Sequence, residues 1–484
     1  MAPPEIPGYY YDAQKRRFFK VEHSQTAPSN AAWSSDKVKK RKLEDEAAAA
    51  QLRRASLNRN RIARSRVLNV PLMGGFLARE YGQHIHDLRD IRPASFAHGI
   101  VGRGQRNLHD WPEPVNLKHV LVASKIPGEP FCKAYFSAES SKIFSVPIPR
   151  DSTGAVDHRL LRETSCATPL GCLCPRWEES VRQVTDIKYS AKANLMLVAS
   201  EDPDTIGYPL HTFTPKRFRH NEHSALYRLK QSYKDETNRK YTSNTICVAP
   251  PASNKICLVG TNLGVAQFDE DCQMRLYTSS NQRGKLLIPD SFRDVFSIDF
   301  HADNPNVMFF GGRPGKVFTG DVREEARKWD VVALNNSITH IKSVSQNQVL
   351  VAGLRNTLSV FDLRYCDLAK VRDKKDPKTE RKAIPVVTMP AYKNAARFDV
   401  GLDYDPQSGV VAAAHDDGRI ALYSVRSGKR LPSRDVDKVH SIIGPIHSLQ
   451  FETLDGDKTP SLFVGDENNI NVYSFGVDDP DEEA

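Results

Sequence analysis

Apolar and polar positions alternate in a repeated order through the C-terminal half of the chain. Residues 295–323 and 338–364 each contain an alternating strand pattern, a polar turn, an apolar strand, a second turn and a closing strand. Residues 398–426 and 446–473 follow the same order. A period of roughly 40–45 residues is typical of the four-stranded blades of β-propellers. The pattern therefore predicts an all-β fold built as a propeller.

The same template predicts blades at 117–149, 184–216, 244–270, 294–323, 337–364, 397–426 and 444–475. We therefore expect a seven-bladed WD40-type β-propeller, with six or eight blades as alternatives because the first two segments match only in fragments. Segments 150–183 and 365–396 are predicted insertions, and the charged run Lys370–Lys382 within the second is predicted to be a mobile loop. Residues 107–115 are our hypothesis for the strand that closes the ring.

The N-terminal extension begins with an aromatic segment. In residues 5–21, Tyr9, Tyr10 and Tyr11 face Phe18 and Phe19 across a polar turn, which predicts a hairpin. A lone hairpin is marginal in water, so it should dock on the propeller or on a partner unless it is disordered. We predict five segments in order. Residues 1–35 hold the hairpin and a polar segment, and residues 36–71 form a basic arm that is helical or disordered. Residues 72–116 hold an amphipathic helix with its lead-in, residues 117–477 the propeller, and residues 478–484 an acidic tail.

Residues 72–90 show a helical pattern. Apolar side chains recur at steps of three and four residues, at Met73, Phe76, Leu77, Tyr81, Ile85 and Leu88. Pro93 is predicted to stop this helix. Its apolar face is expected to pack on the propeller or to bind another protein.

Basic charge is concentrated near the N-terminus. Residues 1–66 contain fifteen Lys and Arg against seven Asp and Glu, or +8 of the total net charge of +9. Nucleic-acid binding is therefore expected only through this arm, because the propeller lacks a basic stripe of its own. The cluster Lys39, Lys40, Arg41 and Lys42 predicts a nuclear import signal, hence a nuclear protein with a cytoplasmic pool as an alternative.

The composition predicts a soluble intracellular protein without a membrane span, because no apolar run approaches about 18 residues and no signal pattern is seen. The eight cysteines are irregularly spaced and are expected to be reduced. Cys172 and Cys174, with Cys166 and His158 nearby, are a weak match to a zinc site, which usually has two Cys pairs. We predict neither a metal nor a cofactor.

Motifs that carry chemistry are scarce. Residues 311–316 superficially match a phosphate-binding loop, but Phe310 replaces its first glycine and Val317 its Ser or Thr. His415, Asp416 and Asp417 are explained by a hairpin turn. We therefore predict no enzymatic activity. A hydrolase remains a rival hypothesis, and it would require acidic residues converging at the central channel.

Two Asp-x-Arg sequences are the most informative polar motif. Asp321 with Arg323 and Asp362 with Arg364 close the third strands of adjacent predicted blades, 41 residues apart. Residues i and i+2 of a strand share a face, so each Asp can hold its Arg extended while guanidinium donors remain for a partner. The alternative is a local ion pair that ties strand to turn.

These motifs resemble those of the WD-repeat substrate receptors of cullin-4 RING ubiquitin ligases. The resemblance covers residues 7–12 and 17–19 at the N-terminus, and 319–323, 358–364, 420–430 and 463–475 in the propeller. It implies that Arg323 and Arg364, with Asp321 and Asp362, contact the damaged-DNA-binding adaptor protein of the ligase. It also implies that the 72–90 helix inserts into the adaptor, through Phe76, Leu77, Tyr81 and Ile85.

The chain departs from the family pattern at three positions. The box usually opens with an aromatic residue, normally Trp. Phe361 keeps an aromatic ring there, whereas Gly320 does not, and the next blade ends Tyr423-Ser424-Val425-Arg426 without the Asp. The leading hypothesis is a non-catalytic receptor that links the ligase to an unidentified protein substrate. The alternative is a nuclear scaffold that binds chromatin or ribonucleoprotein components.

Overall fold

A computed structural model shows that the chain forms two compact units, residues 1–84 and 85–484. The structure describes residues 8–12, 15, 17–23, 26, 32–44, 90–108, 117–124, 126–127, 132–138, 142–149, 176–181, 183–201, 210–215, 227–228, 242–270, 274–278, 294–324, 329–334, 336–370, 379–455 and 457–476.

The first unit is an antiparallel hairpin with a helix. Strands β1 (Tyr9–Asp12) and β2 (Arg17–Lys20) pair Tyr10 with Phe19 and Tyr11 with Phe18. The Phe19 ring stacks on Trp33 at a centroid distance of 4.6 Å, and Arg41 of the helix at residues 35–44 donates a hydrogen bond to the Tyr10 hydroxyl. The predicted hairpin therefore packs on its own neighbouring segment, which supplies the support that two strands alone lack.

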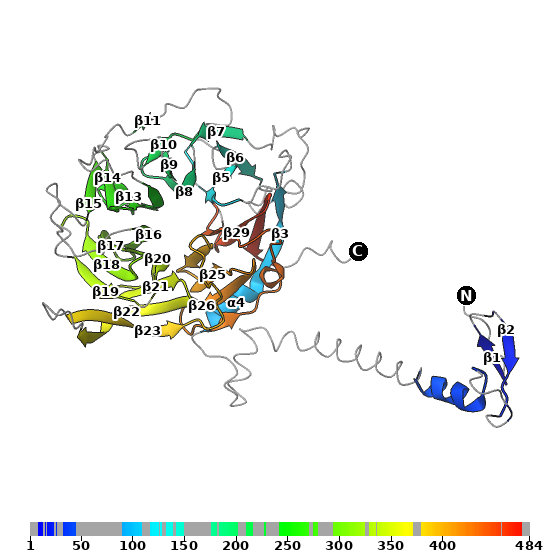
Figure 1. Ribbon diagram of the computed structural model, residues 1–484. Helices are drawn as coiled ribbons and strands as arrows, with labels where there is room; N and C mark the ends of the chain where they lie inside the picture. The colour runs from blue at the N-terminus through cyan, green and yellow to red at the C-terminus, as the bar shows by residue number, and fades with distance from the viewer. Residues whose placement is uncertain are drawn as a thin grey trace. The chain divides into compact units, whose positions relative to one another are not determined.

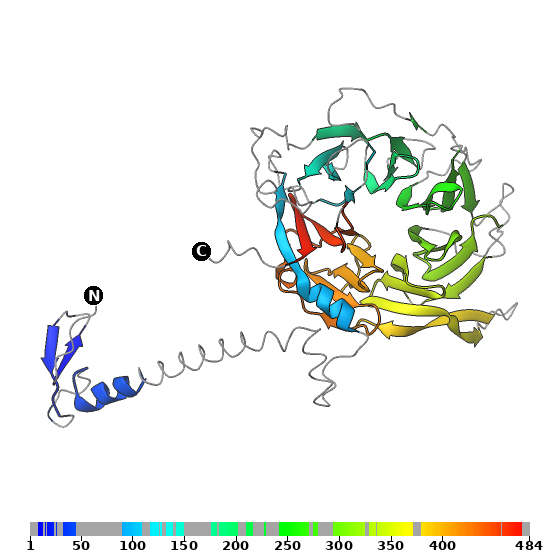
Figure 2. The same cartoon turned by 180° about the vertical axis from the view of Figure 1, so that it is seen from behind.

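The second unit is an all-β, propeller-like ring of antiparallel sheets (Figures 1 and 2). Its first three sheets, in chain order, comprise β4 (Val120–Ala123), β5 (Cys132–Ala138), β6 (Lys142–Ile148) and β7 (Arg176–Ser180); β8 (Val184–Ser190), β9 (Leu195–Ser200), β10 (His211–Phe213) and β11 (Tyr227–Arg228); and β12 (Ser243–Val248), β13 (Lys255–Thr261), β14 (Gly264–Asp269) and β15 (Met274–Thr278).

An eight-stranded sheet follows, made of two antiparallel halves. The halves are β16 (Val295–His301), β17 (Asn304–Gly312), β18 (Lys316–Asp321) and β19 (Asp330–Ala333), and then β20 (Ile338–Ser343), β21 (Gln348–Gly353), β22 (Thr357–Lys370) and β23 (Thr379–Thr388). A single parallel pairing of Ala333 with Lys382 joins them.

The last two sheets comprise β24 (Leu402–Asp405), β25 (Val410–Ala414), β26 (Ile420–Ser424) and β27 (Arg430–Leu431), and then β28 (Ser448–Glu452), β29 (Ser461–Asp466), β30 (Asn469–Phe475) and β3 (Ile100–Asn107). The first strands of successive sheets contact one another in cyclic order, and β28 contacts β4 to complete the ring. A 3-10 helix, η3 (Val436–Lys438), lies beside β26 and β3.

The ring is closed by an N-terminal strand other than the one predicted. Strand β3 pairs with β30 from Ile100 opposite Phe475 to Asn107 opposite Asn469, so the hypothesis of residues 107–115 was wrong. The sequence IVGRGQRN contains two glycines, and a register shift between Gly102 and Gly104 interrupts the alternation that marks a strand. The ring thus includes residues that precede the predicted start at residue 117.

The helix α4 (Ile91–Gly99) leads directly into β3. Pro93 was predicted to end a helix, but it lies in the first turn of this one, where its missing N–H costs nothing. Phe96 and Ala97 are buried in a cluster with Val410, Leu422 and other side chains of the last two sheets. The helix therefore fastens the closing strand to the ring.

The predicted insertion at residues 365–396 contains strand residues at both ends of its charged run. Strand β22 continues to Lys370 and β23 begins at Thr379, with Leu368 opposite Arg381, so residues 370 and 379–382 of the predicted mobile loop lie in paired strands, and residues 371–378 lie outside the described residues. Arg381 pairs with Asp330 of β19 through two hydrogen bonds of 2.6 and 2.5 Å. These cross-strand polar contacts stabilise strands that carry no hydrophobic alternation.

The core lies between neighbouring sheets. One cluster, for example, joins Leu350 and Val360 of the β20–β23 half to Val411 and Tyr423 of the following sheet. The apolar middle strands recognised in the sequence, such as Val410–Ala414, are completely buried. Burial of such strands on both faces explains their continuous apolar runs.

Candidate functional site

The two Asp-x-Arg pairs have the same geometry. Asp321 and Asp362 occupy equivalent positions, opposite Val307 and Gln348 of their neighbouring strands. In the first pair Arg323 Nε lies 2.9 Å from Asp321 Oδ1 and Nη2 lies 2.6 Å from Oδ2. In the second pair the corresponding distances, from Arg364 to Asp362, are 2.9 and 2.7 Å.

Each carboxylate also accepts the backbone N–H of its own arginine, at 2.9 Å in the first pair and 3.1 Å in the second. The arginine side chains are 63% and 65% exposed, whereas the aspartates are 18% and 2% exposed. Hydrogen bonds from the arginines lower the pKa of both Asp321 and Asp362. From the sequence alone, a local ion pair and an outward guanidinium are alternative interpretations. The structure contains both together.

The missing aromatic residue before Asp321 has a structural substitute. A Cβ added to Gly320 would lie 2.6 Å from the ring of Trp329, so the indole covers this glycine. Trp329 is buried, and its ring contacts Tyr277 and Phe310 at centroid distances of 4.9 and 5.4 Å. In the next half-sheet the buried Phe361 stands at the corresponding position. Asp362 therefore follows an aromatic residue, and Asp321 follows a glycine that an aromatic ring covers.

The following sheet, β24–β27, has Ser424 where the two preceding half-sheets have Asp321 and Asp362. A carboxylate from elsewhere in the chain contacts this serine. Ser424 Oγ accepts the backbone N–H of Arg426 at 3.3 Å and donates to Asp90 Oδ1 at 2.5 Å. Asp90 is buried and immediately precedes α4. A carboxylate that is 334 residues away in the sequence thus completes this position. No local sequence signal indicates such a contact.

The other predicted partner residues are distributed as follows. Phe76, Leu77, Tyr81 and Ile85 lie outside the described residues, as do His158, Cys166, Cys172 and Cys174. Lys39, Lys40, Arg41 and Lys42 lie on the helix of the first unit, with exposed lysines. The Arg41 guanidinium packs over Tyr10 at 5.2 Å.

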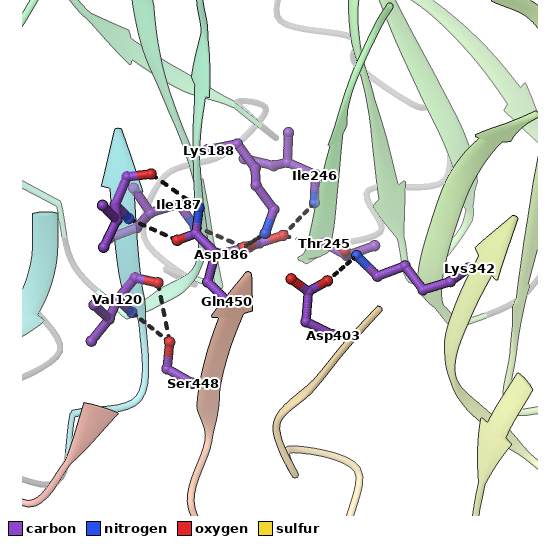
Figure 3. Close-up of polar contacts among 11 residues, drawn as sticks. Val120, Asp186, Ile187, Lys188, Thr245, Ile246, Lys342, Asp403, Ser448 and Gln450 are labelled. Carbon is purple, nitrogen blue, oxygen red and sulfur yellow. Dashed lines mark hydrogen bonds and ion pairs between the residues drawn. The ribbon is translucent and has the colours of Figure 1, made fainter. Parts of the chain in front are cut away.

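Acidic residues on or beside the first strands of several sheets hold neighbouring sheets together, and Figure 3 shows two of them, Asp186 and Asp403. Asp186 accepts the N–H of Ile246 at 2.8 Å, and Asp403 accepts the N–H of Phe451 at 2.8 Å. Asp299 accepts the N–H of Ser343 at 2.7 Å. Each carboxylate thus bonds to the backbone of the next inner strand, a role that sequence inspection missed.

The Lys342 ammonium belongs to the same network of contacts between first strands. Lys342 Nζ lies 2.8 Å from Asp403 Oδ1, and this carboxylate raises the pKa of the lysine. Burial raises the pKa of Asp299 and lowers that of His340 to about 4. The partners of these groups are those of a structural network.

The side chains of His415, Asp416 and Asp417 make hydrogen bonds within their turn and to a neighbouring loop. His415 Nε2 lies 2.9 Å from the Tyr423 hydroxyl, Asp416 accepts the N–H of Ala395, and Asp417 accepts the N–H of Arg419. The described residues contain no group of three or more His, Cys, Asp or Glu side chains arranged to hold a metal ion. No helix of the described segments is long and apolar enough to span a bilayer.

A scan against protein-family models and a search of curated proteins found no match to this chain. The functional argument therefore depends on the geometry of the ring and its exposed arginines.

Proposed function

We propose that the chain is a seven-bladed WD40-type propeller that acts as a non-catalytic substrate receptor of a cullin-4 ubiquitin ligase. The blade count follows if each half of the eight-stranded sheet is one blade, since five further four-stranded sheets belong to the ring. The ligase's catalytic subunits would supply the chemistry, and this chain would hold a protein substrate near them, which raises the effective concentration of the target lysine.

The observation that carries this proposal is the repeated Asp-x-Arg geometry. Two guanidinium groups at equivalent positions of adjacent blades are each fixed by a bidentate pair and are each almost two-thirds exposed. An arginine fixed in advance loses less conformational entropy when a partner carboxylate or carbonyl binds it. We assign this edge of the disc to the damaged-DNA-binding adaptor protein of the ligase.

The preceding segment extends the proposed adaptor surface. Phe76, Leu77, Tyr81 and Ile85 would form the apolar face of a helix that enters a groove of the adaptor. We place the protein in the nucleus, because Lys39, Lys40 and Lys42 are exposed on their helix. A scaffold that binds nucleic acid through the same basic arm is the competing proposal, and it predicts binding that weakens steeply with salt.

Affinity purification of the full chain from cells, followed by mass spectrometry, tests the proposal. The wild-type chain should recover the adaptor and the cullin, and an Arg323→Ala/Arg364→Ala variant should recover much less of both. Arg313→Ala serves as a matched control, because it removes an equally exposed arginine at the opposite end of β18. Equal recovery by wild type and double variant would contradict the proposed surface.

A further inference from the structure

Another exposed arginine, Arg313, is held in place by an aspartate at the opposite end of β18 from Arg323. Arg313 lies in the turn before β18, whereas Arg323 follows the end of the same strand. The strand has six residues, or about 20 Å at roughly 3.4 Å per residue. A partner bound to Arg313 would therefore approach from the face opposite that of the Asp-x-Arg pairs.

Two phenylalanine rings form the platform under Arg313. Phe296 of β16 and Phe398, four residues before β24, contact each other at a centroid distance of 5.0 Å. The β20–β23 half-sheet separates their sheets in the chain, so the rings meet across an intervening blade. The Arg313 guanidinium lies 5.8 and 5.7 Å from the two ring centroids, within the range of cation–π attraction.

Asp294 fixes the same arginine from a second direction. Arg313 Nε donates to Asp294 Oδ2 at 2.8 Å, and the Arg313 backbone N–H donates to the Asp294 carbonyl at 3.2 Å. Only a glycine permits this approach, because a Cβ at residue 312 would lie 1.8 Å from that carbonyl oxygen. The turn is therefore shaped to hold the side chain.

The rest of the guanidinium remains available. The Arg313 side chain is 63% exposed, and among the described residues it donates one hydrogen bond, from Nε to Asp294. The Nη1 and Nη2 groups can thus donate two parallel hydrogen bonds to a carboxylate.

Neighbouring turns add positive charge to this face. Arg355 is exposed in the turn after β21, and its N–H donates to the Ala395 carbonyl. Arg397 is exposed beside Phe398, on a loop that the buried Asn394 fixes through bonds to the Arg397 backbone. The nearby acidic residues have partners of their own: Asp294 pairs with Arg313, Asp416 accepts the N–H of Ala395, and the Asp399 carboxylate lies 3.4 Å from His447 Nδ1.

We propose that Arg313, on its Phe296–Phe398 platform, recognises an acidic segment of a partner protein. A carboxylate would pair with Nη1 and Nη2, Arg355 and Arg397 would attract further acidic residues, and an apolar side chain would contact the half-buried phenylalanine rings. The inference rests on the proposed function in taking this partner as the substrate, because the adaptor would occupy the other face.

Binding of a defined peptide to the purified full chain tests this site. The probe is a fluorescein-labelled octapeptide of alternating Glu and Leu, with alternating Lys and Leu as its control, at about 0.15 M salt to screen the basic arm. Arg313→Ala should raise the Kd about fivefold, as expected for an exposed charge-assisted pair. Arg323→Ala removes the same charge elsewhere and should leave the Kd unchanged, while Arg313→Lys should give an intermediate Kd.

Equal weakening by Arg313→Ala and Arg323→Ala would show general charge attraction and overturn the proposal, as would no weakening by either. A benzophenone-bearing version of the peptide gives an independent location. It should cross-link to residues 294–298, 313–316 or 393–398, and labelling confined to residues 1–66 would refute the site.

The peptide assay contains no ligase subunit. Its result can therefore be interpreted even if the chain fails to recover the adaptor. Arg313→Ala should also retain adaptor recovery. The failure of one proposal is therefore distinguishable from the failure of the other.

Discussion

The indole ring of Trp329 covers Gly320 so closely that a Cβ on this glycine would lie 2.6 Å from it. Gly320 immediately precedes Asp321, and the tryptophan comes from the next segment of the same half-sheet. The glycine and the tryptophan are therefore one structural unit, and they fix the strand end from which Arg323 projects.

Substitution of this glycine should destabilise the ring. We expect Gly320→Ala to lower the free energy of unfolding by about 1–3 kcal/mol, the usual cost of overpacking a buried site. Chemical denaturation measures it, with Gly444→Ala as the control because nothing lies within 4 Å of a Cβ at Gly444. In a Trp329→Ala background the Gly320→Ala cost should almost vanish, and an unchanged cost there would contradict the coupling.

The contact between Ser424 and Asp90 should hold α4 on the ring. Ser424→Ala leaves a buried carboxylate without its hydroxyl donor, so we expect a loss of about 1–3 kcal/mol in the free energy of unfolding. Limited proteolysis should also cleave faster within residues 90–99. Ser427→Ala, at a more exposed position of the same turn, is the control. Equal behaviour of the two variants would show that the contact contributes nothing.

Stability should decrease on mild acidification because of His340. Burial lowers its folded pKa from the ordinary 6.5 to about 4. The unfolded chain therefore binds a proton first as the pH falls, and the contribution of neutral His340, complete above pH 6.5, is lost between pH 6.5 and 4. Between pH 7 and 5 we expect a loss of about 1–2 kcal/mol.

A His340→Gln variant isolates this effect, because glutamine does not titrate. Its melting temperature should fall less between pH 7 and 5 than that of the wild type. Part of the decrease should persist, since burial also lowers the pKa of His119 to about 4. An identical decrease in variant and wild type would show that His340 does not titrate as described.

Sequence periodicity identified the inner three strands of most sheets and missed the outer ones. Buried strands such as Val410–Ala414 carry continuous apolar runs that are easily recognised. The fourth strands are short or polar, as in β27 (Arg430–Leu431) and β23 with its Lys and Arg side chains. Cross-strand partners stabilise these strands, and a linear pattern does not contain that information.

The candidate site was predictable to the extent that it is local. Asp321 and Arg323 are two residues apart, so their shared strand face and their ion pair follow from the sequence. The Trp329 cover, the Asp90 carboxylate and the meeting of Phe296 with Phe398 are contacts between separate segments. Trp329 reaches Gly320 only when β18 and β19 pair, and the other two contacts form only in the folded ring, which is why no linear pattern indicated them.

The measurement that tests the central claim most directly is the Kd of the purified full chain for the damaged-DNA-binding adaptor, by calorimetry. Two fixed, exposed arginines at one interface should together account for more than a tenfold change in affinity. We predict that Arg323→Ala/Arg364→Ala raises the Kd at least about tenfold, while Arg313→Ala leaves it within about twofold of the wild type. A folded double variant that binds the adaptor as tightly as the wild type, or a wild-type chain that does not bind it, would contradict the account.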